Sequence, residues 1–315
     1  MTKQYLRKVR LIVGGSNTPG VVADRDAGID LSELHIKFSV RNTTAQVLKR
    51  AEIRIYNLNQ DVANKIQNEF TRVELSAGYG DDIGLIFQGQ IAQIRVGREN
   101  ATDTYVDIFA QDGDAAYNFS VSNRSLAKGW TPDQLYTSLL QDLEPYGITA
   151  GHKPDFSGES ASRGMACYGM TRDYLRDLAA QQGCEWSLED GKINFVKLSS
   201  FIAGEAVVLN SATGMIGTPE MTLQGLTVRS LLNSRIKSGG QIKIDNASIA
   251  SLQLNIPYAG IDVAPGTDAD GAYTSRVVQH VGDTRGLEWY TSMICVAVDG
   301  TAPAVGPTIV DVPNG

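Results

Sequence analysis

The stretch from residue 73 to residue 114 alternates apolar and polar positions in three consecutive runs, with polar turns between them. A period of two is the pattern of a half-buried β-strand, because successive side chains point to opposite faces. The first turn, GYGDD at residues 78–82, supplies Gly and Asp, which tolerate the positive φ of a hairpin. In the middle run the apolar phase changes beside Gly89, which predicts a bulge or a barrel corner. The stretch therefore predicts an antiparallel meander.

The segments before this meander show the same alternation. Strands are expected around residues 9–13, 34–40 and 51–55, and the phase of the second places His35 on the solvent face. Asn59 is expected to cap a short helix that reaches Phe70. About six strands within some 115 residues predict a small β-barrel or sandwich.

The middle of the chain has a helical pattern. Thr131 and Gln134 form a capping box around Pro132, and leucines then recur every fourth residue up to an expected stop at Gly147. Thr171 is expected to cap a second helix that ends at Gly183. The pair Asp190 and Gly191 lies between two apolar runs and predicts a two-residue hairpin turn. This part of the chain therefore predicts a small α+β insert.

Strand patterns return from about residue 207, and the longest expected hairpin joins residues 273–281 to 288–298 through the turn GDTRG. The segment after Asp299 is rich in Pro and Gly and is expected to be an extended tail. The predicted fold class is mainly β with an α+β insert. The expected domains are a first β module at 1–120, the insert at 121–204, a second β module at 205–299, and a tail at 300–315.

Composition limits the possible partners and compartments. The 32 glycines favour many strand turns, and a formal net charge of -7 argues against nucleic acid as a bound partner. Cys167, Cys184 and Cys295 form no close-spaced pair, which favours reduced, buried thiols. The N-terminal run is too short for a signal peptide and no stretch is long enough to span a membrane, so we expect a cytoplasmic protein without a membrane anchor.

The candidate chemical groups do not form a recognisable catalytic motif. The YGDD run at 79–82 matches a polymerase metal hairpin, but the chain is too short for a polymerase palm, and a turn is the preferred interpretation. His35, His152 and His280 have no zinc-site spacing. The pair Asp112 and Asp114 lacks the ligand ladder of a calcium loop. We therefore expect no metal and no cofactor.

Two further sets of residues have functional and structural interpretations. Cys184 or Cys295 could combine with His280 and Asp283 as a nucleophilic site, but no strand–elbow–helix context supports it, so no catalytic residue is expected. Arg285, Trp289 and Tyr290 could form a surface anchor, because Arg and aromatic residues dominate interface hot spots. Their alternative interpretation is a turn arginine with two core aromatics. For a carbohydrate-binding module, only Trp130 and Trp186 are available as exposed aromatics.

Six segments of the chain, in this order and spacing, resemble the baseplate hub proteins of contractile-tailed bacteriophages. The resemblance is to the late control protein D type of family, and it extends to the N-terminal part of type VI secretion spike proteins. It covers almost the whole chain, including the helix and hairpin of residues 171–197. The segments are AEIRIYNL (51–58), VELSAGY (73–79), GLIFQGQI (84–91), GRENATDTY (97–105), DGDAAYN (112–118) and HVGDTRGLEWY (280–290).

The resemblance implies a structural protein of the phage tail. It implies a homotrimer in which each subunit contributes two tail-tube-like β-barrels, so that three subunits form a pseudo-sixfold ring between a hexameric tail tube and a trimeric central spike. The implied partners are the tail tube protein, the spike protein and other baseplate proteins, with DNA passing through the lumen without specific binding. The implied location is the virion baseplate, after assembly in the host cytoplasm. The alternative is a tail-associated cell-wall hydrolase with its site in the insert.

Overall fold

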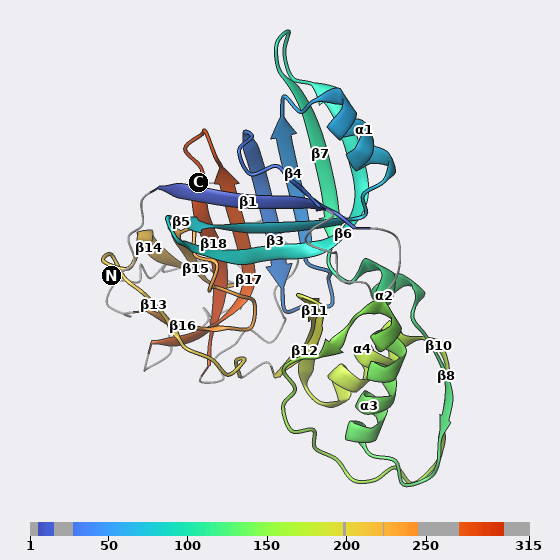
Figure 1. The fold of residues 1–315 in the computed structure, drawn as a ribbon. Coiled ribbons are helices and arrows are strands. Elements are labelled where there is room, and N and C mark those ends of the chain that lie inside the picture. The colour runs from blue at the N-terminus through green and yellow to red at the C-terminus, as the bar shows by residue number, and fades with distance from the viewer. Residues whose placement is uncertain (1–5, 16–27, 198–199, 223, 245–270, 299–315) are drawn as a thin grey trace, which may run out of the picture.

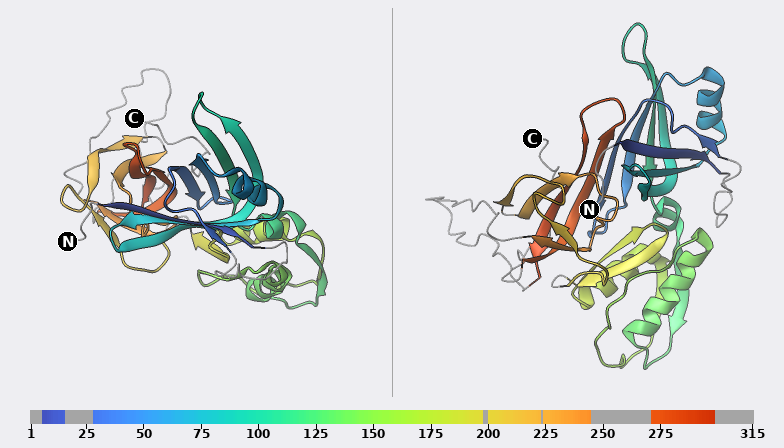
Figure 2. Two further views of the ribbon diagram at one scale, coloured as in Figure 1. Left: turned by 45° about the horizontal axis from the view of Figure 1, so that its top comes forward. Right: turned by 60° about the vertical axis from the view of Figure 1, so that its left-hand side comes forward.

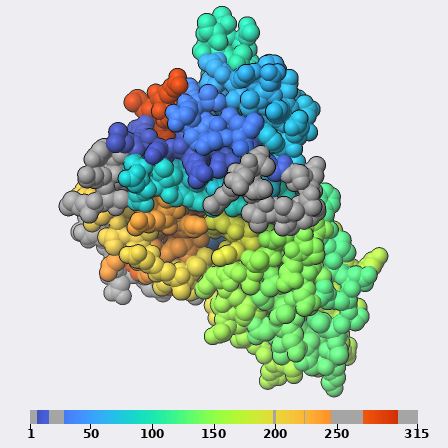
Figure 3. Space-filling view, in the orientation of Figure 1, coloured from blue at the N-terminus to red at the C-terminus, as the bar shows by residue number. Residues whose placement is uncertain are grey.

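The fold consists mainly of strands. The structure is a computed structural model, and it describes residues 6–15, 28–197, 200–222, 224–244 and 271–298. Figure 1 shows a strand-rich body and a lower lobe that holds most of the helices. In the space-filling view this lobe projects from the body (Figure 3). The mainly β fold class with a small helical part is confirmed. The predicted tail at 300–315 lies outside the described residues.

The strands of the body belong to one 13-stranded sheet with the order β14-β15-β18-β17-β3-β4-β7-β6-β5-β1-β2, and β16 attaches β13 to the side of β17. We call β1 to β7 the first strand module. Its strands are β1 (Arg7–Gly14), β2 (Ile29–Asp30), β3 (Ile36–Thr43), β4 (Arg50–Tyr56), β5 (Arg72–Tyr79), β6 (Asp82–Arg98) and β7 (Thr104–Gln111).

The first strand module curls around its own core. In Figures 1 and 2, β1 and β5 cross the direction of β3 and β4. The alternating apolar residues of these strands meet inside, as the period of two predicts. Leu232 and Trp289 also belong to this core, although both come from the far end of the chain. The module therefore depends on residues of the second half to fill its interior.

Strand β6 of the meander is bulged near Gly89, as the sequence predicts, but the bulges do not lie at the glycine itself. Strand β6 pairs with β5 in its first half and with β7 in its second half. Two register shifts leave Ile86 and Ala92 as extra residues, so the bulges lie on either side of Gly89 instead of at it. At Gly89 a Cβ atom would lie 2.6 Å from the carbonyl oxygen of Gln111. The glycine is therefore required by close backbone approach at the corner.

Helix α1 (Gln60–Asn68) packs its Ala63 and Ile66 side chains against this core. The side chain of Asn59 accepts a hydrogen bond from the Asp61 N–H, which confirms the predicted N-cap. Such a cap satisfies one of the free N–H groups of the first turn.

The insert, as we call the elements between Asp114 and Lys197, has a separate core around Trp186, Phe195 and Leu139. A β8–β10 ribbon and a three-stranded sheet of order β11-β12-β9 flank its helices. The elements are α2 (Asp114–Phe119), β8 (Val121–Leu126), α3 (Pro132–Leu143), the 3₁₀ turn η2 (Glu144–Tyr146), β9 (Thr149–Ala150), β10 (Met165–Met170), α4 (Thr171–Gln181), β11 (Cys184–Glu189) and β12 (Lys192–Lys197).

Local signals in the insert are confirmed with one exception. Thr131 and Gln134 form both hydrogen bonds of the capping box of α3. Asp190 and Gly191 have φ values of 52° and 71°, as a type I′ hairpin turn requires. The prediction that Thr171 caps α4 is wrong, because the N-cap is Met170 and makes no side-chain cap. The Thr171 hydroxyl instead accepts a hydrogen bond of 2.8 Å from Ser120 Oγ.

The second strand module consists of the strands from β13 onward and has its own core around Met293, Cys295 and Tyr273. It joins the first module directly, because β17 pairs with β3 through seven residues from Val277 to Asp283. Barrel closure and domain boundaries at residues 120, 204 and 299 stay predictions. The strands are β13 (Val207–Leu209), β14 (Met215–Thr222), β15 (Gly225–Leu231), β16 (Gln241–Ile244), β17 (Ala272–Asp283) and β18 (Trp289–Ala297).

Candidate functional site

The residues predicted as a surface anchor lie at the β17–β18 hairpin but do not share one environment. Trp289 is 2% exposed and packs edge-on against Phe38, with ring centroids 5.5 Å apart. Tyr290 is half-buried, and the Arg229 guanidinium lies 4.5 Å from the centroid of its ring. Arg285 is exposed. Trp289 thus takes the alternative core role, and an interface role for Arg285 stays a prediction.

The turn of this hairpin is held in shape by Asp283. Its carboxylate accepts hydrogen bonds from the N–H groups of Arg285 and Gly286, at 2.9 and 2.8 Å, and is 2.7 Å from His35 Nε2. Burial opposes ionisation, but these hydrogen bonds outweigh it and hold the pKa of Asp283 below its ordinary value. The turn therefore presents Leu287, which is 94% exposed, on a fixed backbone.

His35 lies on the outer face of the sheet, as predicted, where it and Lys37 contact the same Asp283 carboxylate, but it is largely covered there. Its side chain is 24% exposed, and its ring stacks on Tyr56 with centroids 4.4 Å apart. The contacts with Tyr56 and Asp283 therefore cover a side chain that the alternation places on the outer face.

The proposed nucleophilic residues have separate environments. His280 Nδ1 lies 2.9 Å from Thr291 Oγ1, and burial together with the nearby Lys49 cation lowers its pKa to about 3. Burial raises the pKa values of the Cys184 and Cys295 thiols, which keeps them protonated and weakly nucleophilic. Asp283 serves the hairpin turn. This arrangement does not provide a base beside a reactive thiol.

The other candidate motifs have structural roles. Tyr79 pairs with Asp82 across a turn at Gly80 and Asp81, so YGDD is a hairpin, and Asp82 lies 3.5 Å from Arg235. Across the described ranges, no group of three or more His, Cys, Asp and Glu side chains could hold a metal ion.

The tryptophans proposed for carbohydrate binding also lie largely inside the protein. Trp186 is buried and Trp130 is half-buried, and both contribute to the core of the insert. Stacking on a sugar ring needs an exposed aromatic face, which neither residue offers in full.

A buried charge cluster connects all three parts of the molecule, and sequence reasoning missed it. Lys49 precedes β4, Asp112 follows β7, Glu189 and Asp190 lie at the β11–β12 turn, and Lys237 precedes β16. Lys49 Nζ lies 2.8 Å from Asp190 Oδ1 and 3.7 Å from Glu189 Oε1, while Lys237 Nζ lies 2.6 Å from Asp190 Oδ2. Asp112 accepts a hydrogen bond of 2.5 Å from the Asp190 N–H.

Burial sets the protonation of the buried charge cluster. It raises the pKa of Asp112 to about 6 and also raises that of Glu189, because a charged carboxylate loses its hydration there. Burial alone would lower the pKa of Lys49, but the Glu189 and Asp190 carboxylates outweigh it and raise the pKa. The cluster therefore fixes the insert to both strand modules through a charged lysine.

A second contact fixes the same junction. Arg276 of β17 donates from Nη1 to Glu185 Oε2 of β11 at 3.2 Å and from Nη2 to the Lys197 carbonyl at 3.2 Å. Thr44 also donates to the Glu185 carboxylate. Both strand modules thus hold the same strand of the insert.

A charged row crosses the outer face of the body sheet on five adjacent strands, β17-β3-β4-β7-β6. The strand register places Asp283, Lys37, Arg54, Asp107 and Arg95 side by side in this order. Arg54 Nε lies 2.6 Å from Asp107 Oδ1, and Arg95 Nε lies 3.6 Å from Asp107 Oδ2. Lys37 Nζ lies 3.6 Å from Asp283 Oδ2. The cations of the row are therefore already paired with carboxylates.

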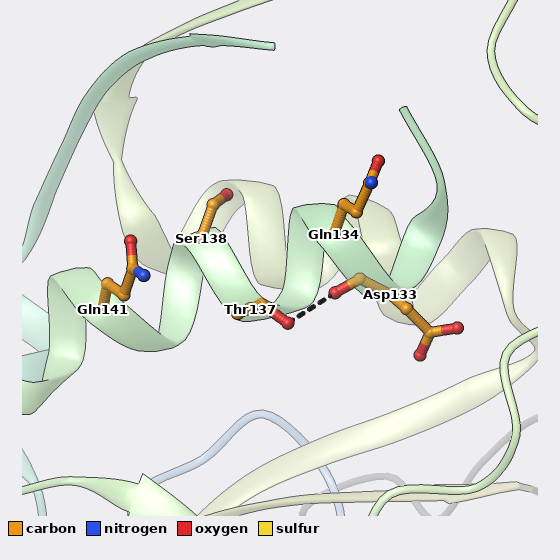
Figure 4. Close-up of a pocket in the computed structure, with 5 residues that line it drawn as sticks. All are labelled: Asp133, Gln134, Thr137, Ser138 and Gln141. Carbon is orange, nitrogen blue, oxygen red and sulfur yellow. Dashed lines mark hydrogen bonds between the residues drawn. The ribbon is translucent and has the colours of Figure 1, made fainter. Parts of the chain in front are cut away.

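A depression on the surface of the insert is the place where the hydrolase alternative would need its site (Figure 4). All its lining residues come from α3, and the Thr137 hydroxyl donates to the Asp133 carbonyl at 2.8 Å. The Asp133 carboxylate lies 2.6 Å from Lys153 Nζ. The depression thus holds one carboxylate, already paired, and no second group for acid–base catalysis. The lining residues are Asp133, Gln134, Thr137, Ser138 and Gln141.

Within the ranges that the structure describes, no helix is long and apolar enough to cross a membrane.

The fold is shared with phage tail proteins and with components of type VI secretion systems. The 43 kDa tail protein of prophage MuSo2 from Shewanella oneidensis superposes with a TM-score of 0.57 at 10% identity, over 93% of this chain and 99% of that one. A tail protein from Neisseria meningitidis MC58 gives a TM-score of 0.57 at 12% identity, over 95% and 98%.

A third structure is the E. coli c3393 protein, a type VI secretion component described as similar to the T4 tail proteins gp27 and gp5. It gives a TM-score of 0.56 at 12% identity, over 96% of this chain and 80% of that one. No family model and no curated protein sequence matches the chain. The likeness is therefore one of fold.

Proposed function

We propose that this chain is a structural hub subunit of a contractile phage tail. Three copies form a ring with pseudo-sixfold symmetry, which joins the hexameric tail tube to the trimeric central spike in the virion baseplate. The tail tube protein, the spike protein and other baseplate proteins are its partners, and assembly takes place in the host cytoplasm. The observation that carries this proposal is the common fold over 93% of this chain and 99% of a prophage tail protein.

The internal architecture supports a subunit that carries load between partners. Two strand modules with separate cores share one sheet through the β3–β17 pairing, and buried ionic contacts fix the insert to both. A ring of three such subunits presents six strand modules. Head-to-tail contacts between identical copies close the ring when the rotation per subunit is one third of a turn.

The proposal includes the absence of catalysis. Its support is the placement of Cys184, Cys295, His280 and Asp283 in separate hydrogen-bonding environments, with both thiols held protonated by burial. The hydrolase alternative has no comparable support, because the α3 depression lacks a second catalytic group.

The test is the solution mass of the full chain, measured by light scattering coupled to gel filtration, followed by electron microscopy. We expect a mass about three times the 34.0 kDa of one chain and threefold ring images. A monomer at micromolar concentration, with purified protein that degrades peptidoglycan, would contradict the proposal. Alanine variants of Cys184 and His280 then locate the activity, since a hub retains its ring in both.

A further inference from the structure

The ribbon formed by β8 and β10 has two unlike edges. The register pairs Tyr168 with Asn123, and the Tyr168 N–H donates at 2.7 Å to the Tyr174 hydroxyl, away from β8. Tyr168 and Asn123 are therefore a pair without mutual hydrogen bonds, and their backbone groups point outward. On the β10 side the Tyr174 side chain covers this edge.

The β8 edge is open. By the same alternation, the N–H and C=O groups of Val121, Asn123 and Ser125 point away from β10. Strand β8 has no other strand partner in the described part of the chain, and it forms the outer margin of the lobe in Figure 1. It also lacks the proline, bulge or lysine that commonly blocks pairing at an edge strand.

The face beside this edge is apolar at one end. Val121 and Tyr168 are 53% and 82% exposed and lie on the outer face of the ribbon, and Phe119, which precedes β8, is 66% exposed. The opposite face is occupied, because Ser122 and Arg124 bind the Asp142 carboxylate of α3. Most exposed apolar residues of a monomer are scattered singly, so a group of three beside an open edge indicates a contact surface.

The other end of the ribbon is basic. The connecting segments 127–129 and 162–164 contain Lys128 and Arg163, both exposed, and no acidic residue. The two segments lie side by side, since a Cβ at Gly164 would be 3.6 Å from the backbone nitrogen of Lys128. The edge therefore runs from an apolar end to a cationic end over one short strand.

We propose that β8 binds an extended segment of a partner protein by strand addition. The segment carries apolar side chains at the end that meets Phe119 and Val121, and acidic side chains at the end that meets Lys128 and Arg163. Outward backbone groups supply the hydrogen bonds and the exposed side chains supply the selectivity. A second copy is a poor occupant, because antiparallel β8–β8 pairing sets the basic end of one copy beside the apolar end of the other.

The probe is a fluorescent octapeptide with alternating valine and threonine and two glutamates at one end, titrated into the full chain by anisotropy. Asn123→Pro removes an outward N–H while leaving the β8–β10 bonds, whereas Asn123→Ala keeps that N–H. We expect the proline variant to bind about tenfold more weakly and the alanine variant to bind like the wild type. Circular dichroism with thermal unfolding shows whether each variant is folded.

Two peptide controls and one exchange measurement complete the test. A peptide with N-methyl groups on alternate residues cannot pair as a strand, and a peptide with lysines in place of the glutamates reverses the charge match. Both should bind about tenfold more weakly, and the glutamate peptide should slow amide exchange at residues 121–125. Equal binding of the N-methyl peptide, or of a folded Asn123→Pro variant, overturns the proposal. Protection of these amides in the free protein, which rises with its concentration, assigns the edge to a second copy and also overturns it.

Discussion

At the scale of single residues, Lys49 is the most informative side chain of the molecule. It is only 3% exposed, and it reaches Asp190 and Glu189 across the junction of the insert and the strand modules. A buried ion pair adds little net stability over an apolar replacement of both partners, but removal of one partner leaves an uncompensated buried charge. The junction therefore tolerates loss of the whole cluster better than loss of its lysine.

We expect Lys49→Met to lower the free energy of unfolding by about 3–5 kcal/mol, because the carboxylates of Glu189 and Asp190 lose their buried cation. Urea unfolding followed by tryptophan fluorescence measures this change. Lys192→Met, at an exposed position of β12, is the matched control and should shift stability by less than about 0.5 kcal/mol. A similar small effect for both variants would show that the cluster does not support the junction.

The pH dependence of stability should carry the signature of Asp112. Its pKa is raised to about 6, so between about pH 4 and pH 6 the folded state binds more protons than the unfolded state. Stability contributed by the protonated form is therefore lost as pH rises through this window, by roughly 3 kcal/mol in total. Asn mimics the protonated form and still accepts from the Asp190 N–H.

Asp112→Asn should accordingly be more stable than the wild type at pH 7 and equal to it near pH 4, as measured by urea unfolding at each pH. Asp114→Asn measures the effect of losing one negative charge nearby. A wild-type advantage that grows from pH 4 to pH 7 would contradict the assigned direction of the Asp112 shift.

At the scale of elements, whether a helix, strand or turn can be predicted from the sequence depends on how close in the chain the residues that determine it lie. The strands β1, β3, β4 and β7 follow from alternation, because each has one face on a core. Caps and tight turns are equally local, so the capping box of Thr131 and the turn at Asp190 are readable from neighbouring residues. The phase change beside Gly89 indicates the bent part of β6, but the positions of its two bulges depend on the registers with β5 and β7, which neighbouring residues do not reveal.

The candidate site was less predictable than the elements, for a related reason. Lys49 stands among ordinary strand residues, and its partner Asp190 is 141 positions away, so no spacing reveals the pair. Trp289 is a residue type that is common in interface hot spots, yet its side chain fills the core of the first strand module, whose strands come from the other end of the chain. The β3–β17 pairing sets Trp289 beside this core, and no spacing along the chain indicates that pairing.

Helix α3 offers a direct test of local control. Thr131→Ala removes the Oγ1 atom that accepts from the Gln134 N–H, but it keeps the backbone N–H that donates to Gln134 Oε1, and it should destabilise the protein by about 1 kcal/mol. Thr137→Ala on the same helix removes only an exposed hydroxyl that bonds to the Asp133 carbonyl (Figure 4), and should have an effect near zero. Thermal unfolding of the two variants compares them, and equal shifts would argue against the capping box as a source of stability.

At the scale of the whole molecule, the charges leave few unpaired cations on the outer sheet face for a polyanion such as DNA to bind. The formal net charge is -7, and the lysine and arginines of the charged row are paired with Asp283 and Asp107. Binding to DNA gains most of its free energy from unpaired cations that displace counterions from phosphates. If the chain has the proposed hub function, its paired cations let a duplex slide past without binding.

We therefore expect no binding of a fluorescent 30-base-pair duplex at about 150 mM salt and protein concentrations up to about 10 μM, as measured by anisotropy. The double variant Asp107→Asn with Asp283→Asn frees the cations of the row and should create measurable, salt-sensitive binding. Tight binding by the wild type would contradict passage of DNA without specific contact.

The pairing of β3 with β17 also determines when the protein can fold during its synthesis. A ribosome makes β3 early, but the strand beside it and the Trp289 side chain that fills its module emerge more than 200 residues later. A nascent chain that lacks its last strands has an open edge at β3 and an incomplete interior. Folding of the first strand module thus waits until β17 and β18 have been translated, and a product truncated before β17 cannot complete that module.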